Sequence, residues 1–588
     1  MNFRHDINGL RAIAVIPVLL FHAGVNGFEG GFLGVDVFFV ISGFLITANI
    51  IKSQKRNDFS LSSFYDKRLR RILPPLIFTL VVTTALSFLF MLPYDLKNFG
   101  QSLVATSIGA NNVLLYLTSG YWSLASEFKP LYHTWSLGVE EQYYFIIPII
   151  FIAFARKKKN LSFTLVLFFF ISFLSAVIID NKEFNFLMII TRFWELCAGS
   201  LLAVYMSERE IVKNSALSII GLFLIFLSYY NPYFLSGNTA VINLPSVLGT
   251  LMVIAFTSVG SLTYRALSLK PIVLTGLSSY SIYLLHQPIL SFLRLATEGH
   301  VDVNTQLAWV LTSIPLGYLS WKFVETPFRN KNIVSNNIFY GLAGGAFFAF
   351  LFIGFFLHKS YGMNDFTVFN KYSYGVNPQA YADRAYTLAQ PSFSADGKKM
   401  LIIGNSFARD FYNALEENSA TNGYEVIYLS DYYLNVSMSR DLLSNADLTF
   451  VVSSSGMANV NIDPQVLRGN AIKYKGELDN YSNGNYYYIG TKNFGFNNNF
   501  LKQVDWKGSR NYMVDINNSN ITADVVESLV FEEKYISLLN LFREGNKTRV
   551  FTDNHKFISF DTEHTTKDGA VFLGKEVLMK TELSKIVL

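Results

Sequence analysis

Eleven apolar stretches constrain the fold of this 588-residue chain more than any other feature of its sequence. Most have roughly 17–25 residues, enough for a helix to cross the hydrocarbon core of a bilayer. Only 15% of the residues are charged, against about 25% in an ordinary soluble domain, so lipid must solvate much of the chain. We predict membrane-spanning helices near 9–26, 32–51, 73–92, 141–155, 161–179, 186–205, 215–230, 244–262, 271–293, 306–324 and 337–357.

The charges of the connecting segments predict the orientation of these helices. Lys and Arg gather in segments 52–71, 156–159, 265–270 and 322–331, whereas the alternating connections are weakly charged or acidic. Basic connections stay on the cytoplasmic side of a membrane. The N-terminus is therefore predicted in the cytoplasm, and the eleventh helix delivers everything after residue 358 to the outside.

The composition changes after the eleventh stretch, where short apolar strands alternate with helical patterns. This alternation predicts an α/β domain with a parallel sheet. The strands are predicted near 400–403, 425–429, 448–452 and 486–489, and the helices near 407–418, 523–544 and 567–586. The predicted domains are 1–335 (ten membrane helices), 336–358 (the eleventh), 359–397 (a linker or wrapping extension) and 398–588 (the outer domain).

Ionisable side chains inside lipid-crossing segments are costly, so each is a candidate functional group. Arg11 and His22 lie eleven residues apart in the first stretch, which returns them to within about 20° of one helix face, roughly 16 Å apart. A cation then lies near the cytoplasmic end of this face and an imidazole near the outer end. The alternative is that Arg11 reaches the headgroups and His22 caps the helix.

Further polar residues occur in or beside the other stretches. Arg68 and Arg71 lie one helical turn apart before Pro74 and Pro75, a spacing that suits bidentate binding of phosphates. The alternative is that Arg68 and Arg71 only keep this connection on the cytoplasmic side of the membrane. The remaining candidates are Tyr132, His133, Glu140, Glu141, His286 and Glu325.

These residues belong to segments that together resemble the acyltransferase-3 family of membrane acyltransferases. The resembling segments are Asn8–Ala12, Phe21-His22, GFLGVDVFFVISGFLIT (31–47), Arg68–Arg71, Tyr132–Leu137, Val139–Gln142, SYSIYLLHQP (279–288) and FVETPFR (323–329). The resemblance covers about residues 5–330 in the family's order. It implies ten helices that take acyl groups, usually acetyl, from cytoplasmic acetyl-coenzyme A.

The same resemblance implies roles for individual residues. The spacing of Arg11 and His22 is a hallmark of the family, and Arg68 and Arg71 match its paired arginines that engage the coenzyme. An imidazole such as His22 is suited to act as general base for a hydroxyl acceptor or to orient the thioester. The family also makes one member of the pair Glu140 and Glu141 important, and their spacing does not choose between them.

The outer domain has a second group of candidate residues. Ser406 follows a predicted strand at the start of a predicted helix, where the helix dipole favours developing negative charge. Asp561 precedes His564 by three residues, close enough to orient its imidazole, whereas the adjacent Glu563 is less able to reach the ring. Ser406, His564 and Asp561 thus form a candidate nucleophile, base and orienting acid. The alternative for Ser406 alone is an ordinary helix cap.

Residues 398–588 resemble the SGNH hydrolase superfamily, with Gly404-Asn405-Ser406 as the first motif and Asp561 to His564 as the last. Asn405 departs from the family pattern, which has Asp at this position; the change removes a charge and keeps hydrogen bonding. The oxyanion donors are less clear: besides the Ser406 backbone N–H, the candidates are Gly456 and Asn459.

The two resemblances together imply a bacterial cytoplasmic-membrane enzyme that acetylates an envelope glycan, with no metal and no nucleic-acid partner. We rank lipopolysaccharide O-antigen or another surface polysaccharide first as acceptor, and peptidoglycan second. The rivals are a glycan transporter or flippase with an accessory esterase, because intramembrane charges also suit a substrate path, and a deacetylase. The single cysteine, Cys197, lies in an apolar stretch and is predicted to be a packing residue.

Overall fold

A computed structural model of the chain describes residues 4–118, 126–154, 158–231, 238–298, 301–365, 374–394, 396–430, 437–453, 463–503 and 512–587. The chain forms two compact units. The first comprises Met1–Leu89, Asn98–Arg294 and His300–His358, and the second comprises Phe90–Lys97, Leu295–Gly299 and Lys359–Leu588.

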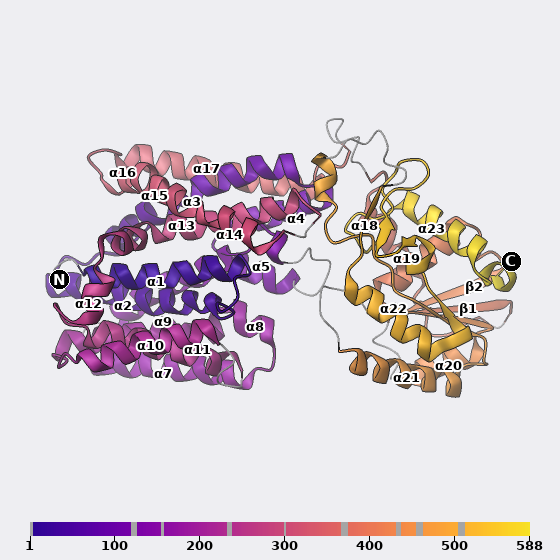
Figure 1. Ribbon diagram of the computed structural model, residues 1–588, viewed down its shortest axis with the longest axis horizontal. Coiled ribbons are helices and arrows are strands. Elements are labelled where there is room, and N and C mark those ends of the chain that lie inside the picture. The colour runs from indigo at the N-terminus through magenta and orange to yellow at the C-terminus, as the bar shows by residue number, and fades with distance from the viewer. Residues whose placement is uncertain are drawn as a thin grey trace. The chain divides into compact units, whose positions relative to one another are not determined.

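The first unit is built from helices that run side by side (Figure 1). The longer ones are α1 (His5–His22), α2 (Gly34–Lys55), α3 (Leu61–Phe90), α4 (Pro93–Ser107), α6 (Thr134–Ala153), α7 (Lys158–Ile178), α9 (Ile189–Glu208), α10 (Ser215–Tyr230), α11 (Thr239–Phe256), α13 (Lys270–Leu295) and α17 (Asn336–Lys359). The shorter ones are α5 (Asn111–Thr118), α8 (Lys182–Leu187), α12 (Leu262–Leu267), α14 (Val303–Leu311), α15 (Ser313–Ser320) and α16 (Thr326–Arg329).

Seven helical segments among the described residues are long and apolar enough to cross a membrane. They are Gly31–Lys55, Leu61–Phe90, Thr134–Ala153, Leu161–Ile178, Lys182–Glu208, Thr239–Phe256 and Asn336–Lys359. Helices also occupy the other predicted ranges, but α10 is shorter and the range 306–324 is divided between α14, α15 and a π-helical turn, Trp321–Glu325. Eleven spans and their orientation therefore stay a prediction. Helices α4 and α5 lie outside the predicted stretches, and α8 is separate from α9 at the start of the stretch predicted near 186–205.

Close packing between α2 and α9 depends on two glycines. A Cβ added to Gly43 would lie 1.8 Å from the carbonyl oxygen of Leu196, and one on Gly199 would lie 2.0 Å from that of Val40. Small residues of this kind let two backbones approach each other in membrane helix pairs.

Replacing Gly43 with alanine is expected to destabilise the first unit by about 1–3 kcal/mol, because the new methyl group overlaps backbone that cannot rotate away. Thermal unfolding of the purified full chain in detergent measures this loss. Gly345→Ala in α17 is the matched control, since nothing lies within 4 Å of its added Cβ. Equal melting temperatures for the two variants would contradict the close packing.

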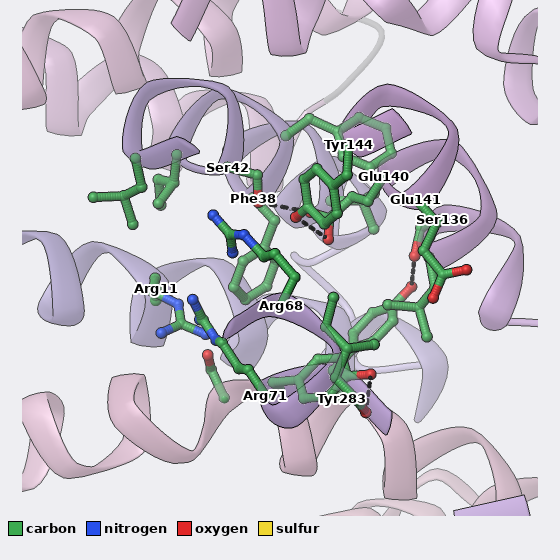
Figure 2. A pocket seen from close by; sticks show the side chains of 18 residues that line it. Arg11, Phe38, Ser42, Arg68, Arg71, Ser136, Glu140, Glu141, Tyr144 and Tyr283 are labelled. Carbon is green, nitrogen blue, oxygen red and sulfur yellow. Dashed lines mark hydrogen bonds between the residues drawn. The ribbon is translucent and has the colours of Figure 1, made fainter. Parts of the chain in front are cut away.

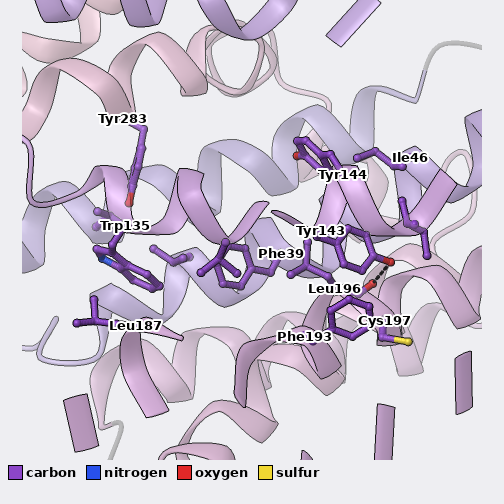
Figure 3. Packing of buried hydrophobic residues seen from close by; sticks show 14 of the residues in the cluster. Phe39, Ile46, Trp135, Tyr143, Tyr144, Leu187, Phe193, Leu196, Cys197 and Tyr283 are labelled. Atoms are coloured by element: carbon purple, nitrogen blue, oxygen red, sulfur yellow. Dashed lines mark hydrogen bonds between the residues drawn. The ribbon is translucent and has the colours of Figure 1, made fainter. Parts of the chain in front are cut away.

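The core of the first unit is aromatic and aliphatic, as Figure 3 shows around Phe39, Trp135 and Tyr143. Cys197 is buried within this core, as a packing residue would be. Buried charges stand beside it: the Arg192 guanidinium lies 3.3 Å from Asp36 and 3.1 Å from Glu195. This pairing offsets the cost of removing three charges from water.

The second unit contains a five-stranded sheet in the order β2-β1-β3-β4-β6, with every pair parallel. Its strands are β1 (Lys398–Ile403), β2 (Tyr424–Leu429), β3 (Leu448–Val452), β4 (Tyr486–Ile489) and β6 (Tyr535–Ile536). A small antiparallel sheet joins β5 (Met513–Asp515), β8 (Lys547–Arg549) and β7 (Arg543–Glu544). The helices are α18 (Pro378–Asp383), α19 (Ser406–Glu417), α20 (Ser437–Asn445), α21 (Pro464–Tyr481), α22 (Asn518–Phe531), α23 (Lys567–Lys580) and α24 (Leu583–Val587). The predicted parallel α/β sheet is confirmed.

One helix of the second unit differs from the sequence prediction. The helix predicted over 523–544 ends at Phe531, because Glu532 has a φ of 51° that no α-helix continues. In the segment 359–397, predicted as a linker or a wrapping extension, Arg384 lies 2.9 Å from Glu417 and hydrogen-bonds Asn413, both of α19.

Candidate functional site

The first unit contains a cavity of about 80 Å³. Its lining comes from α1, α2, α3, α6 and α13 (Figure 2). The polar lining residues are Arg11, Ser42, Arg68, Arg71, Ser136, Glu140, Glu141, Ser279, Tyr144, Tyr280 and Tyr283. Five residues predicted from separate segments of the sequence, Arg11, Arg68, Arg71, Glu140 and Glu141, therefore meet at one cavity.

Three guanidinium groups gather on one side of this cavity, those of Arg11, Arg68 and Arg71 (Figure 2). The Arg68 guanidinium lies 5.1 Å from the ring centre of Tyr144. Arg70, from the same helix, is instead buried in an ion pair 3.1 Å from Asp66. A cluster of cations without an equal number of carboxylates suits a ligand that carries several negative charges.

Two carboxylates of α6 line the cavity, and their contacts distinguish them. Glu140 accepts hydrogen bonds from the Ser42 hydroxyl at 2.7 Å and from the Tyr144 hydroxyl at 2.9 Å. The spacing of Glu140 and Glu141 did not separate them, whereas this geometry shows Glu140 held in one orientation. Glu325 is also buried, 3.3 Å from Arg329, and it interacts electrostatically with Arg11.

Three histidines predicted from different segments lie together at the His22 end of α1. The ring centres of His22 and His286 are 5.0 Å apart, and those of His286 and His133 are 5.4 Å apart. The Nδ1–H of His22 donates to the carbonyl of Val18 at 2.8 Å, and that of His286 donates to the carbonyl of Tyr283. In these tautomers each Nε2 has a lone pair, as a base requires, and the Nε2 of His286 has no partner among the described residues.

Tyr283 connects these two places and was not a candidate from the sequence. It lines the cavity, its hydroxyl lies 2.8 Å from that of Ser136, and its ring centre is 5.1 Å from that of His286. Tyr144 and Ser42 were missed in the same way. A usable signal was present for the tyrosines, since Tyr144 follows Glu140 by one helical turn and Tyr283 precedes His286 by one.

Tyr132 does not join this group. It lines a different cavity of the first unit, of about 800 Å³, together with Glu183 and Asn243. The predicted candidates of the first unit thus divide among the arginine cavity, the histidine cluster, this second cavity and, for Glu325, an ion pair with Arg329.

A Ser–His–Asp arrangement lies in the second unit. The Ser406 hydroxyl is 2.7 Å from Nε2 of His564, and Nδ1 of His564 is 2.7 Å from the Asp561 carboxylate. Burial opposes ionisation of Asp561, but the neighbouring His564 and the hydrogen bonds from the backbone lower its pKa below the usual value. An ionised Asp561 only accepts hydrogen bonds, so it holds the proton on Nδ1 and leaves Nε2 to accept the serine proton.

Local backbone geometry positions Ser406. Gly404, between β1 and α19, has a φ of +144°, and a Cβ there would lie 2.9 Å from the carbonyl of Val452. Asn405 caps α19 by accepting the N–H of Phe407 at 2.9 Å. Since Asn and Asp are both good helix caps, the departure from the SGNH pattern keeps this turn intact.

The loop that carries His564 is held at several points. The Asp561 carboxylate accepts the backbone N–H of His564 at 2.7 Å and that of Glu563 at 3.1 Å. Thr562 has a φ of 79°, a strained conformation that the surrounding hydrogen bonds must enforce, among them the N–H of Phe494 to its carbonyl at 2.7 Å. The predicted oxyanion donors Gly456 and Asn459 lie outside the described residues.

A family model matches the N-terminal half of the chain. The family model described as "Acyltransferase domain" matches residues 4–321, which is more than half of the chain. "O-acetyltransferase OatA" of Staphylococcus aureus (strain NCTC 8325 / PS 47) is 30% identical over 357 residues, 55% of this chain and 57% of that protein. "Peptidoglycan O-acetyltransferase OatA" of Listeria monocytogenes serovar 1/2a is 30% identical over 355 residues, 56% of each chain.

The chain therefore spans somewhat over half the length of the curated relatives it matches. A putative O-acetyltransferase of Staphylococcus aureus strain MSSA476 is similar at 29% identity over 369 residues, 57% of this chain and 59% of that protein. No solved structure shows a significant match.

Proposed function

The chain belongs to the acyltransferase family whose domain spans residues 4–321, and we propose that it is a membrane O-acetyltransferase acting on peptidoglycan. The observation that carries the proposal is the hydrogen-bonded Ser406–His564–Asp561 triad in a chain that also has the family's membrane domain. Such a triad forms and releases acyl-enzymes. The acetyl group is then held as an acetyl-serine intermediate until an acceptor hydroxyl attacks it.

Acetyl-coenzyme A is the proposed donor, bound at the cavity lined by Arg11, Arg68 and Arg71. Coenzyme A carries several phosphates, which the three guanidiniums attract. Glu140, held by Ser42 and Tyr144, offsets part of this positive charge. The predicted orientation of the helices makes this the cytoplasmic end of the site.

His22 is the proposed base for the first transfer. The cavity contacts α1 at Arg11, and the histidine cluster lies at the other end of the same helix. The acceptor of the first transfer is a carrier hydroxyl, such as that of a tyrosine. His22 takes the proton of this hydroxyl as it attacks the thioester, the C–O bond of the carrier ester forms, and the C–S bond breaks. The proton then neutralises the coenzyme A thiolate, so that the free thiol leaves.

Ser406 receives the acetyl group in the second half of the reaction. His564 takes the serine proton as the Ser406 ester forms and the ester bond to the carrier breaks, and it returns the proton to the carrier oxygen, which leaves as a hydroxyl. A sugar hydroxyl then attacks the acetyl-serine with His564 as base, which forms the product ester and restores the Ser406 hydroxyl. Transfer wins over hydrolysis when the sugar hydroxyl is positioned better than water.

Peptidoglycan is the proposed acceptor because a relative at 30% identity is named as a peptidoglycan O-acetyltransferase. Surface polysaccharide, the acceptor that we rank first from the sequence, has less support from the relatives than peptidoglycan. Mass spectrometry of muropeptides and of surface polysaccharide, from cells with and without the gene, tests this choice. Gene-dependent O-acetyl groups on muropeptides support the proposal, and such groups on surface polysaccharide alone overturn the acceptor.

Two other results would identify the rivals. Loss of acetyl groups on expression would identify a deacetylase, since water would then be the acceptor. Export of lipid-linked glycan without dependence on acetyl-coenzyme A would identify a transporter. Both outcomes contradict acetyl transfer.

Replacing Arg68 or Arg71 with methionine is expected to raise KM for acetyl-coenzyme A by about 10- to 100-fold, the effect of losing one hydrogen bond between charged groups. Release of the coenzyme A thiol by the full chain in detergent measures KM. Lys67→Met is the matched control, because Lys67 is exposed on the same helix. An unchanged KM in both arginine variants would remove this cavity as the coenzyme site.

A further inference from the structure

A lysine is buried in the second unit close to the triad. Lys492 follows β4 and is only 1% exposed. Its ammonium lies 2.9 Å from the carboxylate of Asp410 and 3.7 Å from the ring centre of Phe407. Burying an ammonium group costs free energy even when it is paired, so a lysine at this position is expected to have a specific role.

Both contacts of Lys492 lead to neighbours of His564. The Asp410 carboxylate accepts the backbone N–H of Thr565, the residue after His564, at 3.0 Å. The Phe407 ring packs edge-on against the His564 imidazole, with ring centres 5.6 Å apart. The ammonium therefore supports the His564 imidazole in two ways: through Asp410, which holds the adjacent backbone, and through Phe407, which packs against the imidazole ring.

The two intermediaries belong to the helix that carries the nucleophile. Phe407 and Asp410 are one and four residues after Ser406 in α19, so Asp410 lies one turn along the same helix face. Arg409, the residue before Asp410, pairs with Asp383 at 2.7 Å, and its Nε lies 3.8 Å from the Asp410 carboxylate. The nearest cation to the carboxylate that holds Thr565 is thus Lys492.

We propose that Lys492 is a positioning residue for the triad: it fixes Asp410 and Phe407 so that His564 stays within hydrogen-bond distance of Ser406. The proposal rests on the proposed function of Ser406 as nucleophile. Without the ammonium, the buried Asp410 carboxylate keeps only the more distant Arg409, at 3.8 Å, as a cationic neighbour, and Phe407 loses its contact with the ammonium. Asp410 and Phe407 then no longer hold the loop that carries His564 in a fixed position against α19.

The test is the rate at which a fluorophosphonate probe labels Ser406 in the purified full chain in detergent. Lys492→Met is expected to label about 10- to 100-fold more slowly, because a displacement of about 1 Å in the base has an effect of this size. The final stoichiometry, one probe per chain, is expected to remain that of the unaltered protein. Lys475→Met is the matched control: Lys475 is a partly buried lysine of the same unit that donates to the carbonyl of Val530, and its loss leaves the rate unchanged.

A double variant, Lys492→Met with Asp410→Asn, covers the case in which the single variant folds poorly. It leaves no unpaired charge, and the amide oxygen still accepts the N–H of Thr565. We expect it to label at least threefold faster than Lys492→Met and more slowly than the unaltered protein. A double variant no faster than the single one overturns the proposal.

The remaining outcomes distinguish this inference from the function on which it rests. Labelling of Lys492→Met at the unaltered rate overturns the role of Lys492 and leaves Ser406 as nucleophile. A lower stoichiometry with an unchanged rate in the labelled fraction also overturns it, since Lys492 then serves folding alone. Failure of the unaltered chain to label, as in a Ser406→Ala blank, overturns the proposed function instead.

Discussion

Cells that carry Ser406→Ala in place of the unaltered protein are expected to lose gene-dependent O-acetylation of their peptidoglycan. Ser406 is the only group of the triad that forms a bond to the acetyl carbon, and its hydroxyl lies 2.7 Å from Nε2 of His564. Removing the nucleophile of such a triad lowers kcat by at least about 10⁴-fold. The measurement is the O-acetyl content of muropeptides, normalised to the amount of protein in the membrane.

The control is Ser444→Ala in the same unit. Its hydroxyl donates to the carbonyl of Asp441 on the exposed side of α20, so acetylation is expected to stay normal. If Ser406→Ala cells retained normal acetylation, the membrane domain would complete the transfer alone. The triad would then belong to a separate reaction.

Replacement of His22 with glutamine is expected to stop the reaction at an earlier stage. Glutamine keeps a polar group at the end of α1 but has no basic nitrogen, and loss of a general base lowers a rate by about 10²–10⁴-fold. Release of the coenzyme A thiol from acetyl-coenzyme A is expected to fall by that factor in the full chain. Labelling of Ser406 by the fluorophosphonate probe is expected to remain at the unaltered rate.

This pair of readouts separates the two halves of the mechanism. His5→Gln is the matched control, because His5 is an exposed imidazole on the same helix. Thiol release at the unaltered rate in His22→Gln would exclude His22 as the base. Slower labelling of Ser406 in that variant would show that the change acts on folding rather than on the first transfer.

The candidate site was partly readable from the sequence because helical periodicity is local. Eleven residues return to one helix face, which set Arg11 and His22 on a common stripe before any tertiary contact was considered. A strand followed by Gly404-Asn405-Ser406, and an Asp three residues before His564, similarly limit what these side chains can reach. The parallel sheet followed from strands that alternate with helices.

Other parts of the site depend on contacts between distant segments. Ser42 of α2 holds Glu140 of α6 only because these two helices pack together, and the spacing of residues along the sequence does not predict that packing. Arg70 faces away from the cavity, where its guanidinium donates to the carbonyls of Phe328 and Val334, more than 250 residues later in the chain. Lys492 is 82 residues after Asp410, so no motif connects them.

The sequence by itself determined that much of this chain is solvated by lipid, that a parallel α/β unit follows, and that Ser406, Asp561 and His564 occur in triad order. These properties depend on composition and on residues within a few turns of one another. Only the tertiary structure decided which charges are paired, which carboxylate is held, and which lysine supports the base. Buried charges are stable only beside a partner, and folding brings that partner from anywhere in the chain.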